Sequence, residues 1–191
     1  MSTSIDKLIE TTQALLWERG YVGTSPRAIQ DRAGIGQGSM YHHFRSKAAL
    51  AQAAEERSAA ELIEEVRQLL DGPGSPLDRV LAYLRRERDI LKGCRIGRLA
   101  ADPEVVADDA LRKPLEDTFA WVTERLAALL RDAQTDSRLP VGCDPQDLAA
   151  TVLAVRQGGY VLARAANSTT PYERAVEGLI VLLTNNVAAN R

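Results

Sequence analysis

The stretch SPRAIQDRAGIGQGSMYHHFRSK, residues 25–47, decides the fold because it holds the signals for two short helices joined by a tight turn. Ser25 is a favourable N-cap, and Pro26 occupies the first helical position, where its missing N–H costs nothing. Gly34 is placed to end this helix in a left-handed conformation. A second helix is predicted over residues 37–44, directly after the turn.

The second helix has two different faces. An isolated helix shorter than about 12–15 residues is marginal in water, so this helix must pack on the flanking segments. Met40 and Phe44 lie four residues apart and are expected to face the core. Gly36 and Gly38 allow another surface to approach the backbone closely. The remaining face is polar, which suits phosphates and base edges and indicates a helix-turn-helix; it carries Gln37, Ser39, Tyr41, His42 and His43.

Two overlapping segments resemble a known family. GIGQGSMYHHFRSKAAL, residues 34–50, resembles the signature of the TetR family of repressors, and GYVGTSPRAIQDRAG, residues 20–34, matches the same pattern. The match covers roughly the first third of the chain. Pro26 replaces a usual β-branched or small residue, and Gln30 stands where the family usually has Ala. The resemblance implies a dimer that binds a palindromic double-stranded DNA operator and responds to a small effector, with no cofactor.

The motif assigns roles to individual residues. We expect Arg27, Gln37 and Ser39 to read bases, with Gly38 allowing close approach. Phosphate contacts are expected from Tyr41, His43 and Lys47, and the interface also includes Ser25 and His42. Adjacent residues on a helix point about 100° apart, so the two histidines cannot easily share one metal ion, and no metal is expected.

The composition agrees with a DNA-reading head on an acidic body. The 191 residues are 45% hydrophobic, enough for a sizeable core, and the net charge is −2. Residues 1–50 hold six Lys or Arg against four Asp or Glu, whereas the remainder holds eighteen against twenty-two. The asymmetry is small, and the overall charge argues against a non-specific nucleic-acid binder.

The helical pattern extends over the whole chain. Apolar spacings of three and four with turn residues between them predict an all-α fold of about nine helices, without strands or repeats. The expected domains are a helix-turn-helix domain over residues 1–50 and a helical ligand-binding and dimerisation domain over residues 51–191. The helices outside the opening stretch are expected near 4–19, 46–70, from 77 to about 91, within 93–101, and over 108–135, 145–166 and 171–187.

The final helix is apolar around most of its circumference, which requires burial on both sides. A partner subunit is the simplest cover, and the TetR resemblance implies a dimer interface built from the last two helices. The interface is expected to comprise Val152, Val155, Gly159, Leu162, Val176, Leu179, Ile180 and Leu183.

The TetR resemblance also implies an effector pocket among the middle helices and the long connecting helix. We expect a mainly apolar lining, which favours an aromatic or lipophilic ligand. The lining residues are predicted to be Tyr83, Cys94, Arg98, Leu99, Phe119, Trp121, Val122 and Tyr160. The basic cluster of Arg85, Arg86, Arg88, Lys92, Arg95 and Arg98 reads mainly as a solvated face, although Arg95 or Arg98 could contact a ligand carboxylate.

Other functions have weaker support. The chain lacks a G-x-S-x-G elbow, an H-E-x-x-H motif, a P-loop and a G-x-G-x-x-G motif, so it is not expected to be an enzyme. Cys94 leaves a small Cys-dependent enzyme or thiol sensor as the alternative, and a helical adaptor that has lost DNA binding as a third. Cys94 and Cys143 do not make a disulfide framework. Without a signal pattern or a membrane-length apolar run, a cytoplasmic protein is expected.

Overall fold

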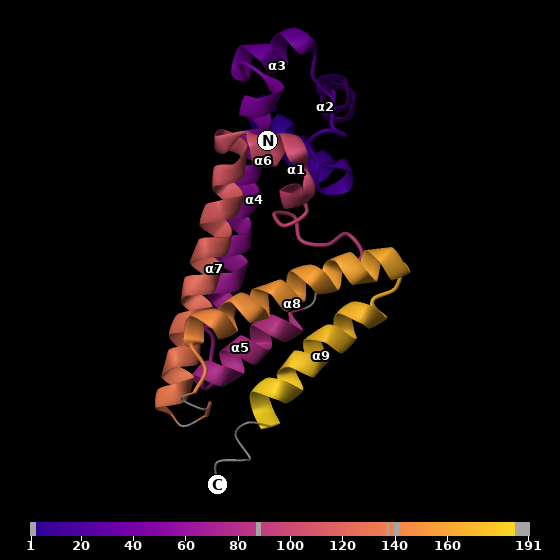
Figure 1. Cartoon of the computed structure of the whole chain (residues 1–191). Coiled ribbons are helices and arrows are strands. Elements are labelled where there is room, and N and C mark those ends of the chain that lie inside the picture. The colour runs from indigo at the N-terminus through magenta and orange to yellow at the C-terminus, as the bar shows by residue number, and fades with distance from the viewer. Residues whose placement is uncertain (1–2, 87–88, 137, 140–141, 186–191) are drawn as a thin grey trace. The chain divides into compact units, whose positions relative to one another are not determined.

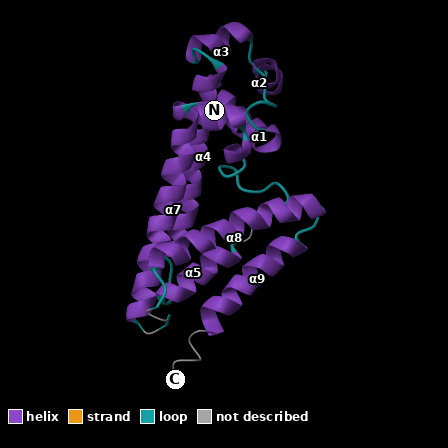
Figure 2. Ribbon diagram, viewed as in Figure 1, coloured by secondary structure: helices purple, strands orange, loops and turns teal. Residues whose placement is uncertain are grey.

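The computed structural model describes residues 3–86, 89–136, 138–139 and 142–185, and this part of the chain contains helices and loops but no strand (Figure 2). The predicted all-α fold is therefore confirmed. In chain order the elements are α1 (Ser4–Arg19), α2 (Pro26–Ala33), α3 (Gln37–His43), α4 (Lys47–Leu70), α5 (Pro76–Arg85), η1 (Leu99–Ala101), α6 (Pro103–Ala107), α7 (Asp109–Thr135), α8 (Pro145–Ala166) and α9 (Thr170–Asn185) (Figure 1).

Local signals explain where most helices begin. Thr3 forms a capping box with Asp6 at the start of α1, and Ser75 does the same with Asp78 at α5. Proline occupies the first turn of five of the described helices, where its fixed φ favours helix and its missing N–H is not needed. These five prolines are Pro26, Pro76, Pro103, Pro145 and Pro171.

Two elements differ from the sequence-based expectation. Helix α5 ends at Arg85, so Leu91 lies outside it in a turn that the Gly93 amide closes by donating to the Asp89 carbonyl at 3.1 Å. The short helix α6 was missed, although Asp102 caps it and Pro103 follows directly. Val187, expected in the last helix, lies outside the described residues.

The chain forms two compact units, and the change from one to the other falls within α4 and again within α7. Unit 1 comprises residues 1–62 and 94–118, and unit 2 comprises residues 63–93 and 119–191. The expected helix-turn-helix domain, residues 1–50, lies within unit 1, which also contains residues 51–62 and the segment 94–118. In the described part of the chain, no helix is long and apolar enough to cross a bilayer.

In unit 2, helices α8 and α9 pack side by side (Figure 1). Gly159 makes this approach possible, because a Cβ atom added there would lie 2.8 Å from Cδ2 of Tyr172. The apolar core of the unit includes Leu84 of α5, Leu126 of α7 and Val152 of α8, each with 0% exposure.

Candidate nucleic-acid interface

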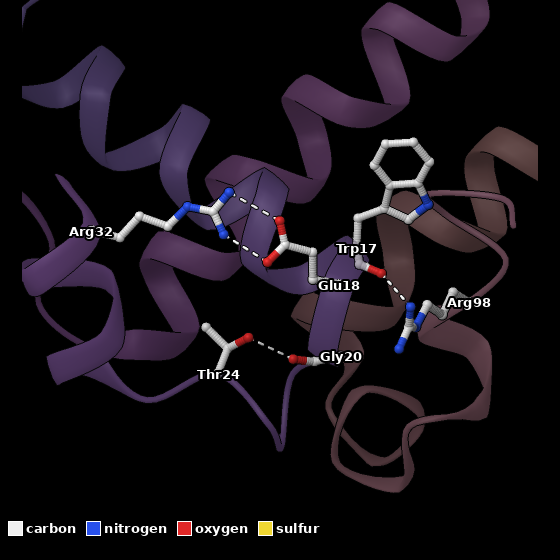
Figure 3. Close-up of polar contacts among 6 residues, drawn as sticks. All are labelled: Trp17, Glu18, Gly20, Thr24, Arg32 and Arg98. Carbon is white, nitrogen blue, oxygen red and sulfur yellow. Dashed lines mark hydrogen bonds and ion pairs between the residues drawn. The ribbon is translucent and has the colours of Figure 1, made fainter. Parts of the chain in front are cut away.

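Polar contacts fix α2 on the first helix of unit 1 (Figure 3). The Arg32 guanidinium forms a bidentate ion pair with the Glu18 carboxylate, with N–O distances of 2.7 and 2.9 Å. The Thr24 hydroxyl donates to the Gly20 carbonyl at 2.7 Å, closing the turn between α1 and α2. Bidentate arginine–carboxylate pairs set orientation as well as distance, so α2 has a defined place on α1.

The turn between α2 and α3 has the predicted geometry. The Ser25 hydroxyl accepts from the Ala28 amide at 3.1 Å, and Ile29 is buried. Gly34 ends α2 in the left-handed region with φ 67° and ψ 33°, where glycine carries no Cβ penalty. Ile35 follows half-buried rather than fully buried. The short turn therefore sets the angle at which α3 leaves α2.

Helix α3 buries one side chain completely and exposes most of the others. Met40 is fully buried, and the Gln30 side-chain amide donates to its sulfur at 3.7 Å, which joins α2 to α3. Phe44, expected to face the core, is half-buried. The predicted contact residues of the helix all lie exposed on the chain, namely Gln37, Gly38, Ser39, Tyr41, His42 and His43.

The two glycines at the start of α3 are not required by the fold of this chain. A Cβ atom added at Gly36 or Gly38 would meet no heavy atom within 4 Å. The backbone there faces open space, so a partner molecule can approach it without meeting a side chain. This observation supports the role assigned to Gly38.

Lys47 is held at the first position of α4. Its Nζ atom lies 3.8 Å from the centroid of the Tyr21 ring, a cation–π contact. The Ser46 hydroxyl caps the helix by accepting from the Ala49 amide at 3.1 Å. Partial burial lowers the pKa of Lys47, while the carboxylates of Glu104 and Asp102 oppose the shift.

Two exposed arginines lie in the segments before and after α3 along the chain. Arg27, in the first turn of α2, pairs with Asp31 at 3.7 Å, and its side chain is 89% exposed. Arg45, which the sequence interpretation missed, is exposed in the turn between α3 and α4. Its position between the expected phosphate contacts His43 and Lys47 could have identified Arg45 as a candidate contact from the sequence.

The two histidine side chains at the end of α3 contact each other edge to face. The rings of His42 and His43 lie 5.1 Å apart at an interplanar angle of 66°. In the part of the chain that the structure describes, no group of three or more His, Cys, Asp or Glu side chains could hold a metal ion.

The segment 94–118 packs beneath the turn between α1 and α2. Arg98 donates to the Trp17 carbonyl at 2.5 Å (Figure 3), and the Val22 amide donates to Asp102 Oδ2 at 2.9 Å. Glu55, on α4, is 1% exposed and has no hydrogen-bond partner for either carboxylate oxygen among the described residues. Burial, with the charges of Asp108 and Asp102, raises the pKa of Glu55 to about 8.

The predicted effector-pocket residues fall into both units. Cys94, Arg98 and Leu99 belong to unit 1, whereas the other five belong to unit 2. Within unit 2, Tyr83 and Tyr160 meet around the buried side chain of Arg156, which the sequence interpretation did not single out. Phe119 and Trp121 are half-buried on α7, and Val122 is buried beside them in sequence. Arg67 lies 5.7 Å from the Trp121 ring.

Most of the predicted dimer-interface residues are covered by their own chain. Of the eight, Leu162 is exposed and Val155 is half-buried. The other six are buried within unit 2, namely Val152, Gly159, Val176, Leu179, Ile180 and Leu183. The exposed large apolar side chains of α8 and α9 are instead Val161, Leu162, Val181 and Leu182. An interface on these helices would use this exposed set, which we call the apolar strip.

Both cysteines are free, and they lie in different units. Cys94 is buried and Cys143 is exposed. The thiol of Cys94 is therefore packed as a small apolar side chain.

Comparison with known proteins supplies two family matches and several whole-chain relatives. Residues 8–54 match bacterial regulatory proteins of the tetR family, and residues 75–179 match the tetracyclin repressor-like C-terminal domain. The chain is 27% identical over 178 residues to the HTH-type transcriptional repressor NemR of Escherichia coli K12, covering 90% of this chain and 89% of NemR. It is 28% identical over 172 residues to the transcriptional regulator AcuR of Cereibacter sphaeroides, covering 85% and 77%.

Solved structures share the fold. The crystal structure of reduced E. coli NemR superposes with a TM-score of 0.81 at 26% identity, covering 92% of this chain and 94% of NemR. The TetR family regulator CifR, solved as a cysteine mutant with a 26-bp double-strand operator DNA, superposes with a TM-score of 0.74 at 23% identity, covering 93% and 94%.

Proposed function

This chain belongs to the TetR family of bacterial regulatory proteins, and we propose that it represses transcription by binding a palindromic operator as a homodimer that a small effector releases. The observation that carries the proposal is the exposed polar face of α3 around the fully buried Met40. A seven-residue helix that buries one residue and exposes its polar side chains suits insertion into the major groove. CifR, which has the same fold, was solved with operator DNA, and NemR is named a repressor.

In this proposal the contacts divide by chemistry. Gln37 and Ser39 on α3 and Arg27 on α2 read base edges, because amide, hydroxyl and guanidinium groups match the donor and acceptor pattern of the major groove. The backbone at Gly38 approaches the DNA. Phosphates are bound by a separate set that fixes register without reading sequence, namely Ser25, Tyr41, His42, His43, Arg45 and Lys47.

The dimer forms in the proposal through the apolar strip on α8 and α9. Leu162 and Leu182 are 54% and 66% exposed in the single chain, and in the dimer the partner subunit would cover them. A twofold dimer reads a palindrome whose half-sites are centred about 34–36 Å apart, or a multiple of that distance. Because bacterial operators lie in the cytoplasm, the proposal places the protein there.

Effector control requires differential binding. A ligand with equal affinity for the operator-bound and the released conformation does not shift the equilibrium between them, however tightly it binds. Operator and effector must therefore weaken each other's binding by the same factor.

Fluorescence anisotropy with labelled DNA tests the proposal. We expect the wild-type protein to bind the DNA upstream of its own gene more tightly than a scrambled duplex, with affinity that falls as salt increases. Gln37→Ala should lose discrimination at one base-pair position, worth about 1–3 kcal/mol. Equal affinity of the wild type for upstream and scrambled DNA would contradict sequence-specific repression. Turnover of ester or thiol reagents would instead favour the alternative of a Cys94-dependent enzyme.

A further inference from the structure

We propose that unit 2 binds its effector through a carboxylate, and that Arg156 is the residue that receives it. The inference rests on the effector control proposed above and goes beyond it by naming the chemical class of the ligand and its anchor. Arg156 lies on α8 with only 3% of its surface exposed. Its surroundings explain why a negative ligand group is expected there.

The guanidinium of Arg156 is bound only by neutral groups. Its Nη1 donates to the Tyr83 carbonyl at 2.7 Å, its Nε to the Tyr172 hydroxyl at 3.1 Å and its Nη2 to the Tyr160 hydroxyl at 3.1 Å. Among the described residues, no carboxylate forms an ion pair with it. These bonds use three of the five N–H groups that a guanidinium carries.

The positive charge is therefore not neutralised. Arginine stays protonated in proteins, and burial raises the pKa of Tyr172 to about 12, so this phenol is neutral at physiological pH. A buried charge with only neutral partners is costly, and buried charges are normally paired. A ligand anion would supply the missing charge.

The geometry of the bonds indicates a carboxylate in particular. The Nε and Nη2 hydrogens form one edge of the planar guanidinium, the edge that accepts the two oxygens of a carboxylate side by side. Two separate phenol oxygens now stand at this edge. Because charge-assisted bonds are about twice as strong as neutral ones, a carboxylate can displace at least one phenol oxygen from it.

Aromatic surfaces around this edge favour a ligand with an apolar body. The Tyr160 and Tyr172 rings stack with their centroids 4.8 Å apart, and the Arg156 guanidinium carbon lies 4.4 Å from the Tyr83 ring centroid. A carboxylate bound at this edge would place its attached group among these rings, and aromatic side chains favour apolar neighbours. The ligand class is thus a small carboxylic acid with an apolar body, bound as its anion.

The arginines first considered from sequence are engaged elsewhere. Arg95 pairs with Glu61 at 3.2 Å and lies 4.8 Å from the Trp17 ring centroid. Arg98 donates to the Trp17 carbonyl. Both lie in unit 1, and Arg95 already has a carboxylate partner. The anchor for an anion is therefore assigned to Arg156 instead.

Matched acid–amide pairs test the proposal. Benzoate, phenylacetate and hexanoate are each compared with the corresponding amide by thermal shift and titration calorimetry on the full-length protein at pH 7.5. We expect at least one acid to raise the melting temperature and bind at least tenfold more tightly than its amide. If no acid binds, or if the amides bind as well as the acids, the proposal is wrong.

Variants then locate the site. Arg156→Gln should abolish binding of the acid, whereas the exposed control Arg131→Gln should keep it. Tyr172→Phe retains the guanidinium but removes one competing oxygen, so the acid should bind more tightly to this variant. If Arg156→Gln does not fold, the Tyr172→Phe variant tests the site alone. Acid binding by Tyr172→Phe that is equal to or weaker than that of the wild type would overturn the assignment to Arg156.

Operator DNA separates this inference from the function on which it rests. If binding of an acid depends on Arg156 and the bound acid releases operator DNA, both the carboxylate site and effector control are supported. If the acid requires Arg156 but leaves operator affinity unchanged, the carboxylate site stands and effector control fails. If operator binding is intact and no acid binds, the DNA function stands and the carboxylate site fails.

Discussion

The Nζ atom of Lys47 lies 3.8 Å from the centroid of the Tyr21 ring, so the turn after α1 positions the first residue of α4. The ring restricts a flexible side chain, and an ordered ammonium group loses less entropy when it binds a phosphate. Tyr21 is thereby a positioning residue for the phosphate contact proposed for Lys47.

Lys47→Ala should weaken binding to specific and scrambled DNA alike, because a phosphate contact carries no sequence information. The slope of log affinity against log salt should fall in magnitude by about 0.9 for one lost contact. Anisotropy titrations at several salt concentrations measure both quantities. Lys7→Ala removes the same charge from an exposed position in α1 and should leave the slope unchanged. An equal change in the two variants would assign the effect to net charge alone.

Gly38→Ala should separate stability from DNA binding. Alanine is favoured over glycine within a helix by up to about 1 kcal/mol, and beyond its own turn of helix the new methyl group meets no heavy atom within 4 Å. The melting temperature should hold or rise, while operator affinity falls at least tenfold, about 1.4 kcal/mol, because the methyl group occupies space assigned to DNA. Operator affinity equal to that of the wild type would show that the DNA does not approach this backbone.

Leu182→Asp should give a folded monomer. Leu182 is 66% exposed on the apolar strip, so a charge is tolerated in the single chain but is buried unpaired in the proposed dimer. Analytical ultracentrifugation should show the monomer, and circular dichroism should show retained helix. Leu179→Asp places the same charge at a site only 8% exposed and should unfold the chain. If the Leu182→Asp variant is still a dimer, the dimer interface does not lie on the apolar strip.

Glu55 should make stability depend on pH. Burial raises the pKa of Glu55 from its ordinary value of 4.5 to about 8 in the folded chain, so the folded state holds a proton that the unfolded state releases. Its contribution to stability is complete below pH 4.5 and is lost as pH rises towards 8, with a slope of at most about 1.4 kcal/mol per pH unit. Denaturant unfolding at pH 6 to 8.5 measures this slope.

The matched variant for this slope is Glu55→Gln, which cannot titrate. It should unfold with a flatter pH dependence over the same range, whereas the exposed Glu10→Gln should behave as the wild type. A wild-type slope retained in Glu55→Gln would assign the pH dependence to other groups.

The fold could be predicted from the sequence where the signals are local. Ser25 and Gly34 lie next to the helix ends that they define, so caps and turn residues could be identified without any tertiary information. Pro76 and Pro145 lie in the first turns of α5 and α8, so the signal for these two helix starts is also local. Leu91 was misplaced because apolar spacing alone does not show where a helix stops.

The buried charges could not be predicted because their partners are distant in sequence. Arg156 meets the Tyr83 carbonyl 73 residues away, and on an isolated helix it resembles a solvated arginine. Glu55 gave no signal for the same reason. The apolar circumference of α9 indicated burial on several sides, but periodicity could not tell which residues, such as Leu179, face the chain itself and which, such as Leu182, face outward.

The division of unit 1 between two stretches of sequence has a consequence for protein engineering. Asp102 and Arg98 lie more than one helix beyond residue 62, yet they bond to the turn and end of the N-terminal helices. A chimera joined at a single point after α4 would carry α3 of one regulator without that regulator's segment 94–118, which packs with the N-terminal helices. An exchange of operator specificity between relatives should therefore transplant residues 94–118 together with residues 1–62.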